Sequence, residues 1–313
     1  MQNIRNNLSQ LIQTESFKKR YDNMKKEILA DSDVKNFLVE HAQELSKDVV
    51  ERSLVKLYEY TQQSKQCKEC PSLAACKNIL QGYHPHLIIS GKTIDLQYER
   101  CSQKIFHDQQ KKQQSLIRSL YMPRDILEAK QVSLDYNDKG RMNAVNEAEE
   151  FVEQYEPGKK MKGLYLFGRF GVGKTYILGV IANELAQRNV SSMLVHVPEF
   201  LREMKGSIGD HTLNTKIEAV KQAPILMLDD IGAEAMSSWA RDEVLGTILQ
   251  FRMLENLPTF FTSNFDFKLL EHHLTYTQRG EEEELKAARI MERIRYLAKP
   301  VEVKGNNRRQ TGE

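Results

Sequence analysis

The chain has 313 residues, which is more than one average domain, so we expect two. Its 40% hydrophobic content is enough for a core, and a net charge of +2 is too close to balance to indicate a nucleic-acid binder by itself. The first residues, MQNIRNNLSQL, lack the apolar centre of a signal peptide, and no apolar run approaches the length of a membrane span. We therefore expect a cytoplasmic protein with no membrane partner.

The first 60 residues carry apolar side chains at helical spacing. These side chains are Leu8, Leu11, Ile12, Phe17, Met24, Ile28 and Leu29, followed by Val34, Phe37, Leu38, Val49, Val50, Leu54, Leu57 and Tyr58. Residues 86–98, HLIISGKTIDLQY, then place SGK between two apolar runs, which predicts a β-hairpin. We expect residues 1–105 to form a mainly helical N-terminal domain.

All four cysteines lie between residues 67 and 101, in the pattern C-x₂-C-x₅-C followed by a distant fourth. Such a cluster does not resemble the disulfide framework of a secreted protein, so we expect reduced thiols. Two cysteines separated by two residues can bend around one tetrahedral metal ion. The pattern predicts a structural Zn²⁺ bound by Cys67, Cys70, Cys76 and Cys101.

Other arrangements of this region stay open. Two histidines lie between the third and fourth cysteines, and His84 is the main alternative ligand, with His86 also a candidate. Buried thiols or a redox pair are the non-metal alternative. A redox pair would follow a strand in a βαβ unit, and the preceding TQQSKQ is no such strand.

The segment SQKIFHDQQKKQQ, residues 102–114, is polar and offers few side chains that could pack. We expect a linker over residues 106–130, between the N-terminal domain and a second domain over residues 131–313.

Apolar strands and helical patterns alternate beyond this linker. Strands are predicted over 163–168, 192–198, 224–232, 258–265 and 299–305, and helices over 174–189, 199–207, 212–222, 237–256 and 281–298. This alternation predicts an α/β domain whose parallel sheet is covered by helices on both faces.

A phosphate-binding motif joins the first of these strands to its helix. GRFGVGKT, Gly168–Thr175, fits G-x-x-x-x-G-K-[ST]. Its glycines allow backbone N–H groups to face a phosphate, and Lys174 can reach the β- and γ-phosphates. The Thr175 hydroxyl is the expected Mg²⁺ ligand. We predict an ATP or GTP site, with ATP the expected nucleotide, whose binding residues are Gly168, Gly171, Val172, Gly173, Lys174, Thr175, Tyr176 and Asp229.

The strand ILMLDD supplies two carboxylates at its end, Asp229 and Asp230. We expect Asp229 to orient Mg²⁺, directly or through water, and Asp230 to act as general base towards the attacking water. Their alternative role is to cap a helix, because DDIG leads into a turn.

The order of these motifs resembles the AAA+ ATPases, in the branch of replication initiators and helicase loaders. The resemblance implies that Asn264, after the strand PTFFTS, holds the lytic water near the γ-phosphate; its alternative is to cap the next helix. It also implies that Arg293 acts as an arginine finger in a neighbouring subunit, with Arg289 the next candidate. Salt bridges to Glu281–Glu284 are the alternative for both arginines. Few residues follow Gly305, so we expect no C-terminal helical lid.

A zinc-binding helical domain joined to a lidless AAA+ core resembles the replicative helicase loaders of Bacillus-type bacteria over nearly the whole chain. The pattern CKECPSLAAC…YERC makes the resemblance specific. It implies that the N-terminal domain binds the hexameric replicative helicase, and that the ATPase domain couples nucleotide state to placing the helicase on single-stranded DNA. It further implies self-association on binding ATP or helicase.

The DNA contacts and the rival functions stay open at this point. Phe170 and the KGNNRR tail are candidates for DNA contact, but neither is assigned. The nearest alternative function is a transposition-associated AAA+ ATPase that recruits a transposase to DNA. A small-molecule kinase and an adaptor with a structural nucleotide are further alternatives.

Overall fold

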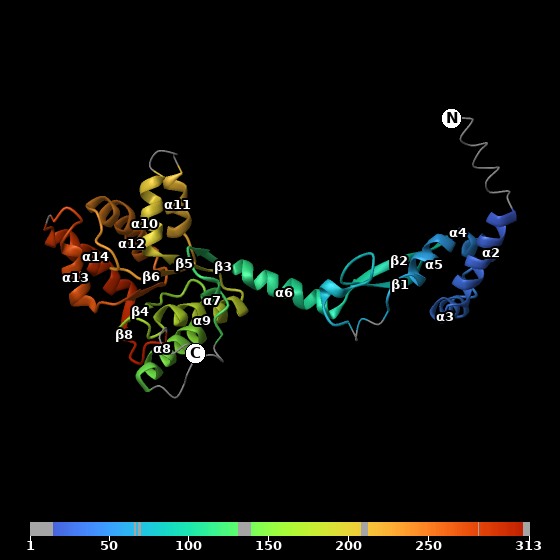
Figure 1. The fold of residues 1–313 in the computed structure, drawn as a ribbon, viewed down its shortest axis with the longest axis horizontal. Helices are drawn as coiled ribbons and strands as arrows, with labels where there is room; N and C mark the ends of the chain where they lie inside the picture. Colours follow the sequence, from blue (N-terminus) through green and yellow to red (C-terminus); the bar gives the residue numbers. More distant parts are fainter. Residues whose placement is uncertain are drawn as a thin grey trace. The chain divides into compact units, whose positions relative to one another are not determined.

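The computed structural model describes residues 15–65, 67, 70–130, 139–207, 212–280 and 282–308 (Figure 1). The chain divides into two compact units, Met1–Gln110 and Lys111–Glu313. The helical pattern that begins at Leu8, Leu11 and Ile12 lies outside the described residues. Among the helices of these residues, none combines the length and the hydropathy that a membrane crossing requires.

The described residues of the N-terminal unit form helices followed by a hairpin, and the hairpin lies where it was predicted. The helices are α2 (Glu15–Ala30), α3 (Ser32–Glu40), α4 (Lys47–Arg52) and α5 (Leu54–Thr61). Asp31 caps α3, because its side chain accepts hydrogen bonds from the N–H groups of Asp33 and Val34. A short 3₁₀ helix, η2 (Leu73–Ala75), precedes the antiparallel strands β1 (Tyr83–Ser90) and β2 (Thr93–Arg100).

The core of this unit is small. Among the described residues, its cluster of buried apolar side chains consists of Ile28, Val34, Leu57, Tyr60 and Ile94. Buried Ser53 ties the helices to the hairpin: its hydroxyl donates to the Val49 carbonyl at 2.8 Å and accepts from the Ile94 N–H at 2.8 Å.

The segment expected to be a linker contains three folded elements. Helix α6 (Ser102–Leu116) buries none of its residues and carries an i,i+4 ion pair, Lys104–Asp108, at 2.9 Å. Strand β3 (Ile117–Leu120) pairs with β5, and α7 (Arg124–Leu127) packs on α9. Part of the segment that we expected to be a linker therefore belongs to the folded second unit, because β3 and α7 pack against elements of that unit.

The second unit has a six-stranded parallel sheet in the order β3-β5-β6-β7-β4-β8. The five predicted strands are present as β4 (Gly163–Phe167), β5 (Ser192–His196), β6 (Ile225–Asp229), β7 (Thr259–Ser263) and β8 (Ala298–Glu302). All their pairings are parallel, so their carboxyl ends meet at one edge. β3 is the strand that sequence reasoning missed.

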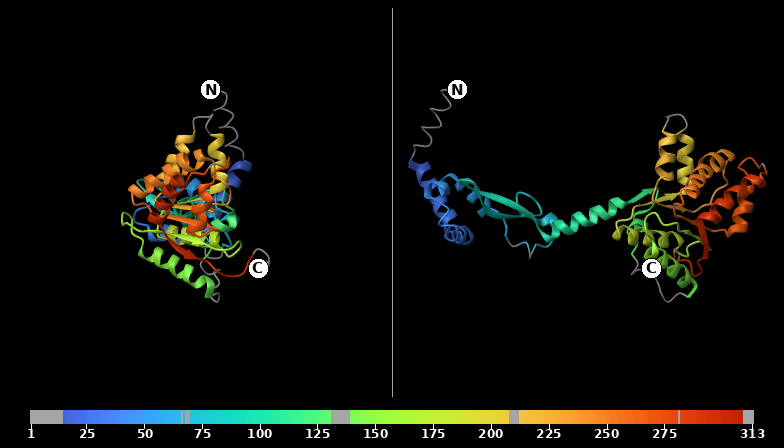
Figure 2. Two further views of the ribbon diagram at one scale, coloured as in Figure 1. Left: turned by 90° about the vertical axis from the view of Figure 1, so that its left-hand side faces the viewer. Right: turned by 180° about the vertical axis from the view of Figure 1, so that it is seen from behind.

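Helices cover both faces of this sheet (Figure 2). They are α8 (Lys139–Gln154), α9 (Lys174–Gln187), α10 (Val197–Gly206), α11 (Leu213–Lys221), α12 (Gly246–Leu254), α13 (Phe267–Thr275) and α14 (Glu284–Leu297). A π-helical segment, η4 (Ala240–Leu245), runs directly into α12. Helix α8 was not predicted. The helix predicted over 237–256 is present as a continuous stretch, in which the turns of η4 are π-helical and those of α12 are α-helical.

Candidate nucleotide-binding site

The loop between β4 and α9 has the glycine conformations that a phosphate-binding loop needs. Gly173 has φ +95° and lies at the N-terminus of α9, where no described side chain caps the helix. Side chains other than glycine rarely adopt this φ. The first N–H groups of α9 therefore remain available to an anion, and the helix dipole favours negative charge there.

Lys174 is nearly buried, at 8% exposure, within this loop. Its ammonium donates to the carbonyl oxygens of Gly168 and Arg169, each at 2.9 Å, and to Oδ1 of Asn264 at 2.9 Å. The cation thus lies between the loop and the end of β7. Oxygen acceptors already surround it in a position where phosphate oxygens could compete for the same protons.

Thr175 and Asp229, to which the sequence analysis assigned the same Mg²⁺, lie in hydrogen-bond contact. The Thr175 hydroxyl donates to Oδ1 of Asp229 at 2.8 Å, and the Thr262 hydroxyl donates to the same oxygen at 2.7 Å. Asp229 is 5% exposed at the end of β6. A hydroxyl and a carboxylate are the hard oxygen ligands that Mg²⁺ prefers. The donor set therefore fits that ion.

His196 is a further neighbour of Asp229 that sequence reasoning missed. Its Nδ1 lies 3.4 Å from Oδ2 of Asp229, because the ends of β5 and β6 are in register. The hydrogen bond to Asp229 raises the pKa of His196 above its ordinary value, against the effect of burial. The sequence feature that could have identified His196 is its position at the end of the predicted strand SMLVH.

Asp230 and Asn264 face each other beside this pair. Asn264 donates from Nδ2 to Oδ1 of Asp230 at 3.2 Å, and the Asp230 N–H donates to the Thr262 hydroxyl at 2.8 Å. Asp230 has φ +60°, a strained conformation for a residue with a side chain, and such strain clusters at functional sites. The capping role considered for Asn264 belongs to Asp266, which accepts from Leu269 N–H at 2.8 Å.

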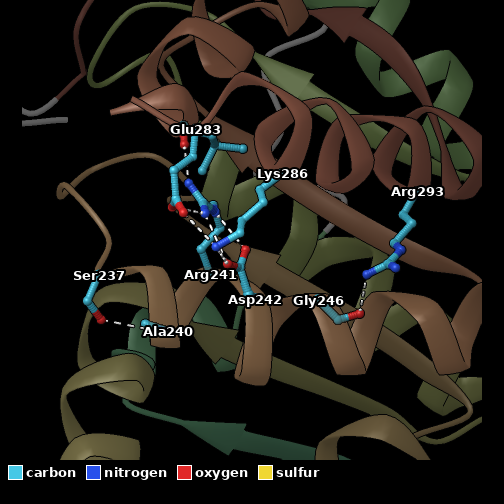
Figure 3. A network of polar contacts seen from close by, with 9 residues as sticks. Ser237, Ala240, Arg241, Asp242, Gly246, Glu283, Lys286 and Arg293 are labelled. Atoms are coloured by element: carbon cyan, nitrogen blue, oxygen red, sulfur yellow. Dashed lines mark hydrogen bonds and ion pairs between the residues drawn. The ribbon is translucent and has the colours of Figure 1, made fainter. Parts of the chain in front are cut away.

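The two candidate finger arginines differ in their surroundings. Arg293 is half-buried and donates from Nη1 to the Gly246 carbonyl at 2.8 Å, at the junction of η4 and α12 (Figure 3). Arg289 is exposed, and no described residue makes a hydrogen bond or ion pair with it. Within the described part of the glutamate run, no side chain pairs with either arginine.

Glu283 from that run instead takes part in a separate network (Figure 3). It accepts from Arg241 Nη2 and from Lys286 Nζ, each at 2.5 Å, and Asp242 also binds Arg241 at 2.7 Å. Hydrogen bonds from Lys286 and Arg241 lower the pKa of Glu283 to about 2. Because Arg241 is 1% exposed in η4, this network fixes the start of α14 on η4.

The cysteines do not form a ready-made metal site. Across the described residues, no group of three or more His, Cys, Asp or Glu side chains is arranged to hold a metal ion. The thiols are nevertheless neighbours: burial and then the thiols of Cys101, Cys76 and Cys70 raise the pKa of Cys67. Nδ1 of His84 is buried without a hydrogen-bond partner among the described residues.

Comparison with known proteins places both units in one family. Residues 1–98 match the family of the primosomal protein DnaI N-terminus, and residues 127–312 match the IstB-like ATP binding proteins. The replicative helicase loader DnaI of Bacillus subtilis (strain 168) is 52% identical over 94% of each chain. The chain belongs to the DnaI family of replicative helicase loaders.

Solved structures agree with this family membership. A crystal structure of DnaI, 62% identical, covers 63% of this chain and 99% of its own, with a TM-score of 0.57. A putative primosome component from Streptococcus pyogenes serotype M3, 40% identical, covers 64% and 98% with a TM-score of 0.54. The resemblance inferred from the motifs is confirmed, and the transposition-associated alternative is not favoured.

Proposed function

We propose that this protein is an ATP-dependent loader that binds the hexameric replicative helicase and places it on single-stranded DNA. Membership of the DnaI family supports the choice of partner. One observation carries the ATPase half of the proposal. Five residues that were predicted separately from three parts of the sequence lie in one connected hydrogen-bond network. They are Lys174, Thr175, Asp229, Asp230 and Asn264.

The residues of this network divide the chemistry of hydrolysis between them. Lys174 would neutralise the β- and γ-phosphates, and Thr175 with Asp229 would hold Mg²⁺, which offsets developing negative charge. Asp230 would accept the proton of the attacking water, and Asn264, already bonded to Asp230, would orient that water. The glycine-rich backbone from Gly168 to Gly173, with Tyr176 after it, completes the nucleotide contacts.

Arg293 is the proposed finger for the site of a neighbouring subunit. To act there its guanidinium would leave the Gly246 carbonyl that it now contacts. Arg289, exposed one helical turn earlier on the same face, is the next candidate. Self-association on binding ATP or helicase is part of this proposal, because a trans finger requires a neighbour.

The same proposal gives the N-terminal unit a structural Zn²⁺ and the helicase contact. Gly82 bonds to two of the cysteines, since its N–H donates to Cys76 Sγ at 3.3 Å and its carbonyl accepts from the backbone N–H of Cys101 at 2.9 Å. Thiolates of this set are ordinary zinc ligands, so a four-cysteine site with Cys67 and Cys70 is our first choice. His84 is the alternative ligand, because its Nδ1 is buried and lacks a partner within the described residues.

Single-stranded DNA is proposed to bind the ATPase unit, and we assign no contact residue to it. A cytoplasmic location follows from the proposed work on the bacterial chromosome.

A loading assay tests the proposal. The full chain, the hexameric helicase, Mg-ATP and circular single-stranded DNA are mixed, and helicase retained on DNA is measured together with phosphate release. Asp230→Asn should keep binding helicase and ATP but lower hydrolysis by about 100-fold or more, since it removes the general base. Asp266→Asn is the matched control, because asparagine also caps a helix.

Loading by the unmodified chain without any stimulation by ATP would contradict the ATP-dependent part of the proposal. Transfer of phosphate to an acceptor, in place of release to water, would favour the kinase alternative.

A further inference from the structure

The residues after β8 run along the phosphate-binding loop. Val303 donates its N–H to the Phe167 carbonyl at 2.7 Å, where β4 ends, and Arg308 donates its N–H to the Gly171 carbonyl at 3.1 Å. We call Val303–Arg308 the C-terminal strap. It contains most of the KGNNRR tail, to which the nucleotide chemistry described above assigns no role.

The Asn307 side chain lies against the loop at Gly171. Its Oδ1 lies 1.9 Å from the position that a Cβ on residue 171 would occupy, so the carboxamide would have to move if another residue replaced this glycine. Gly171 also has φ +76°. The backbone conformation of the loop therefore favours glycine here, and the missing side chain leaves room for the carboxamide packed against it.

The strap is also attached to the start of α8. Lys304 donates its N–H to the Gly140 carbonyl at 3.1 Å. The next residue, Arg141, is 4% exposed, and its guanidinium carbon lies 3.9 Å from the Cβ position of Gly173. The strap and Arg141 of α8 therefore lie beside the same glycine segment of the loop, and the strap is bonded to α8.

The bond to Gly171 matters because of the geometry of the peptide unit. The Gly171 carbonyl and the Val172 N–H belong to one planar trans peptide, so they point in opposite directions. When the strap holds the carbonyl, it also sets the direction of the Val172 N–H. A phosphate-binding loop acts through such N–H groups, whose orientation decides how well they meet an anion.

We propose that Asn307 is a positioning residue of the nucleotide site, which docks the C-terminal strap on Gly171 and so orients the Val172 N–H towards phosphate. The inference rests on the proposed ATPase function, since it takes ATP as the ligand. Because docking and nucleotide binding favour the same loop conformation, each strengthens the other. The neutral carboxamide suits this place, whereas a carboxylate would repel the phosphates.

The test measures the affinity of the full chain for Mg-ATP by titration calorimetry. Asn307→Asp should weaken ATP binding about tenfold through charge repulsion near the phosphates, and Asn307→Ala should weaken it less. Both should raise KM for ATP more than they lower kcat. Asn306→Asp adds the same charge at an exposed neighbour and should bind ATP like the unmodified chain.

Hydrogen exchange gives a second readout that a purely structural role would not move. ATP should slow exchange of the Arg308 N–H in the unmodified chain and not in Asn307→Ala. Equal ATP affinity in all four proteins, or exchange at Arg308 that ATP leaves unchanged, would overturn the proposal. Failure of the unmodified chain and of Asn306→Asp to bind ATP is a different result, which would overturn the proposed function as well.

Discussion

The two units of this protein bury apolar surface on very different scales. In the described part of the N-terminal unit, the buried core cluster is small. In the ATPase unit, strands β4 to β8 contribute buried residues to large clusters on the two faces of the sheet. Stabilisation by apolar burial grows with the apolar area removed from water. The smaller unit therefore gains much less free energy of folding from burial.

Polar contacts supplement the small core but cannot replace a large one. Lys65 bridges Asp31 and Asp33 at 3.1 and 2.9 Å, and Tyr98 donates to Glu59 at 2.6 Å. Partly exposed contacts of this kind each contribute little. The comparison teaches that the larger unit has the apolar burial to carry strained residues such as Asp230, and it is the reason why we propose an added cross-link, a structural zinc, for the N-terminal unit.

The largest expected effect is the removal of the proposed zinc ion. A strong chelator added to the full chain should unfold the N-terminal unit, since a structural zinc site contributes on the order of 10 kcal/mol. ATP affinity should be unchanged, because the ATPase unit has its own core. Metal analysis, circular dichroism and ATP titration check this. A metal-free protein whose circular dichroism is that of the untreated chain would refute the zinc proposal.

A matched pair of core truncations compares the stabilities of the two units directly. Leu57 and Leu178 are both fully buried, one in each unit. Replacing either by alanine should cost about 2–5 kcal/mol. Leu57→Ala should unfold its unit near room temperature, whereas Leu178→Ala should only lower the melting temperature of the ATPase unit. Calorimetry of the full chain measures the unfolding transition of each unit. An equal fall in melting temperature in the two variants would refute the difference in stability between the units.

Lys174→Ala tests whether nucleotide chemistry is confined to the larger unit. Loss of the ammonium should weaken ATP binding by about 100-fold or more, because charge-assisted contacts to the phosphates disappear. Binding of the helicase by the N-terminal unit should survive. Lys159→Ala, at an exposed lysine, is the control. The loop assignment is wrong if calorimetry finds the two variants equal in ATP affinity.

The smallest effect concerns acid stability of the ATPase unit. The folded-state pKa of Glu283, about 2, lies below the ordinary value of 4.5. Its contribution is therefore fully present above pH 4.5 and is lost as the pH falls towards 2. Glu283→Gln should flatten the pH dependence of the urea midpoint in that range. The exposed neighbour, Glu284→Gln, should not; an identical slope in both variants would argue against the network around Arg241.

The features that the sequence predicted best are those determined by residues close together in the chain. The phosphate-binding loop follows from the order of its glycines, and the hairpin follows from Gly91 between two apolar runs. The five longer strands were recognisable as apolar runs between helices. In each case the signal lies within a few residues of the feature.

The features that were missed depend on partners distant in the sequence. Strand β3 is only IRSL, and it is a strand because β5 pairs with it. His196 reaches Asp229 only through the register of β5 on β6, and Asn307 meets Gly171 only after β8 has joined β4. The π-helical turns of η4 likewise show no composition that separates them from an α-helix.

The order of strands in the sheet also determines when the site can form as the chain is synthesised. β4 carries the phosphate-binding loop, yet its two neighbours are β7 and β8, the last strands to leave the ribosome. The hairpin of the N-terminal unit closes between Ser90 and Thr93 and needs nothing further along the chain. We therefore expect the N-terminal unit to fold first on the ribosome, while the capacity to bind ATP arises only once β8 has joined β4.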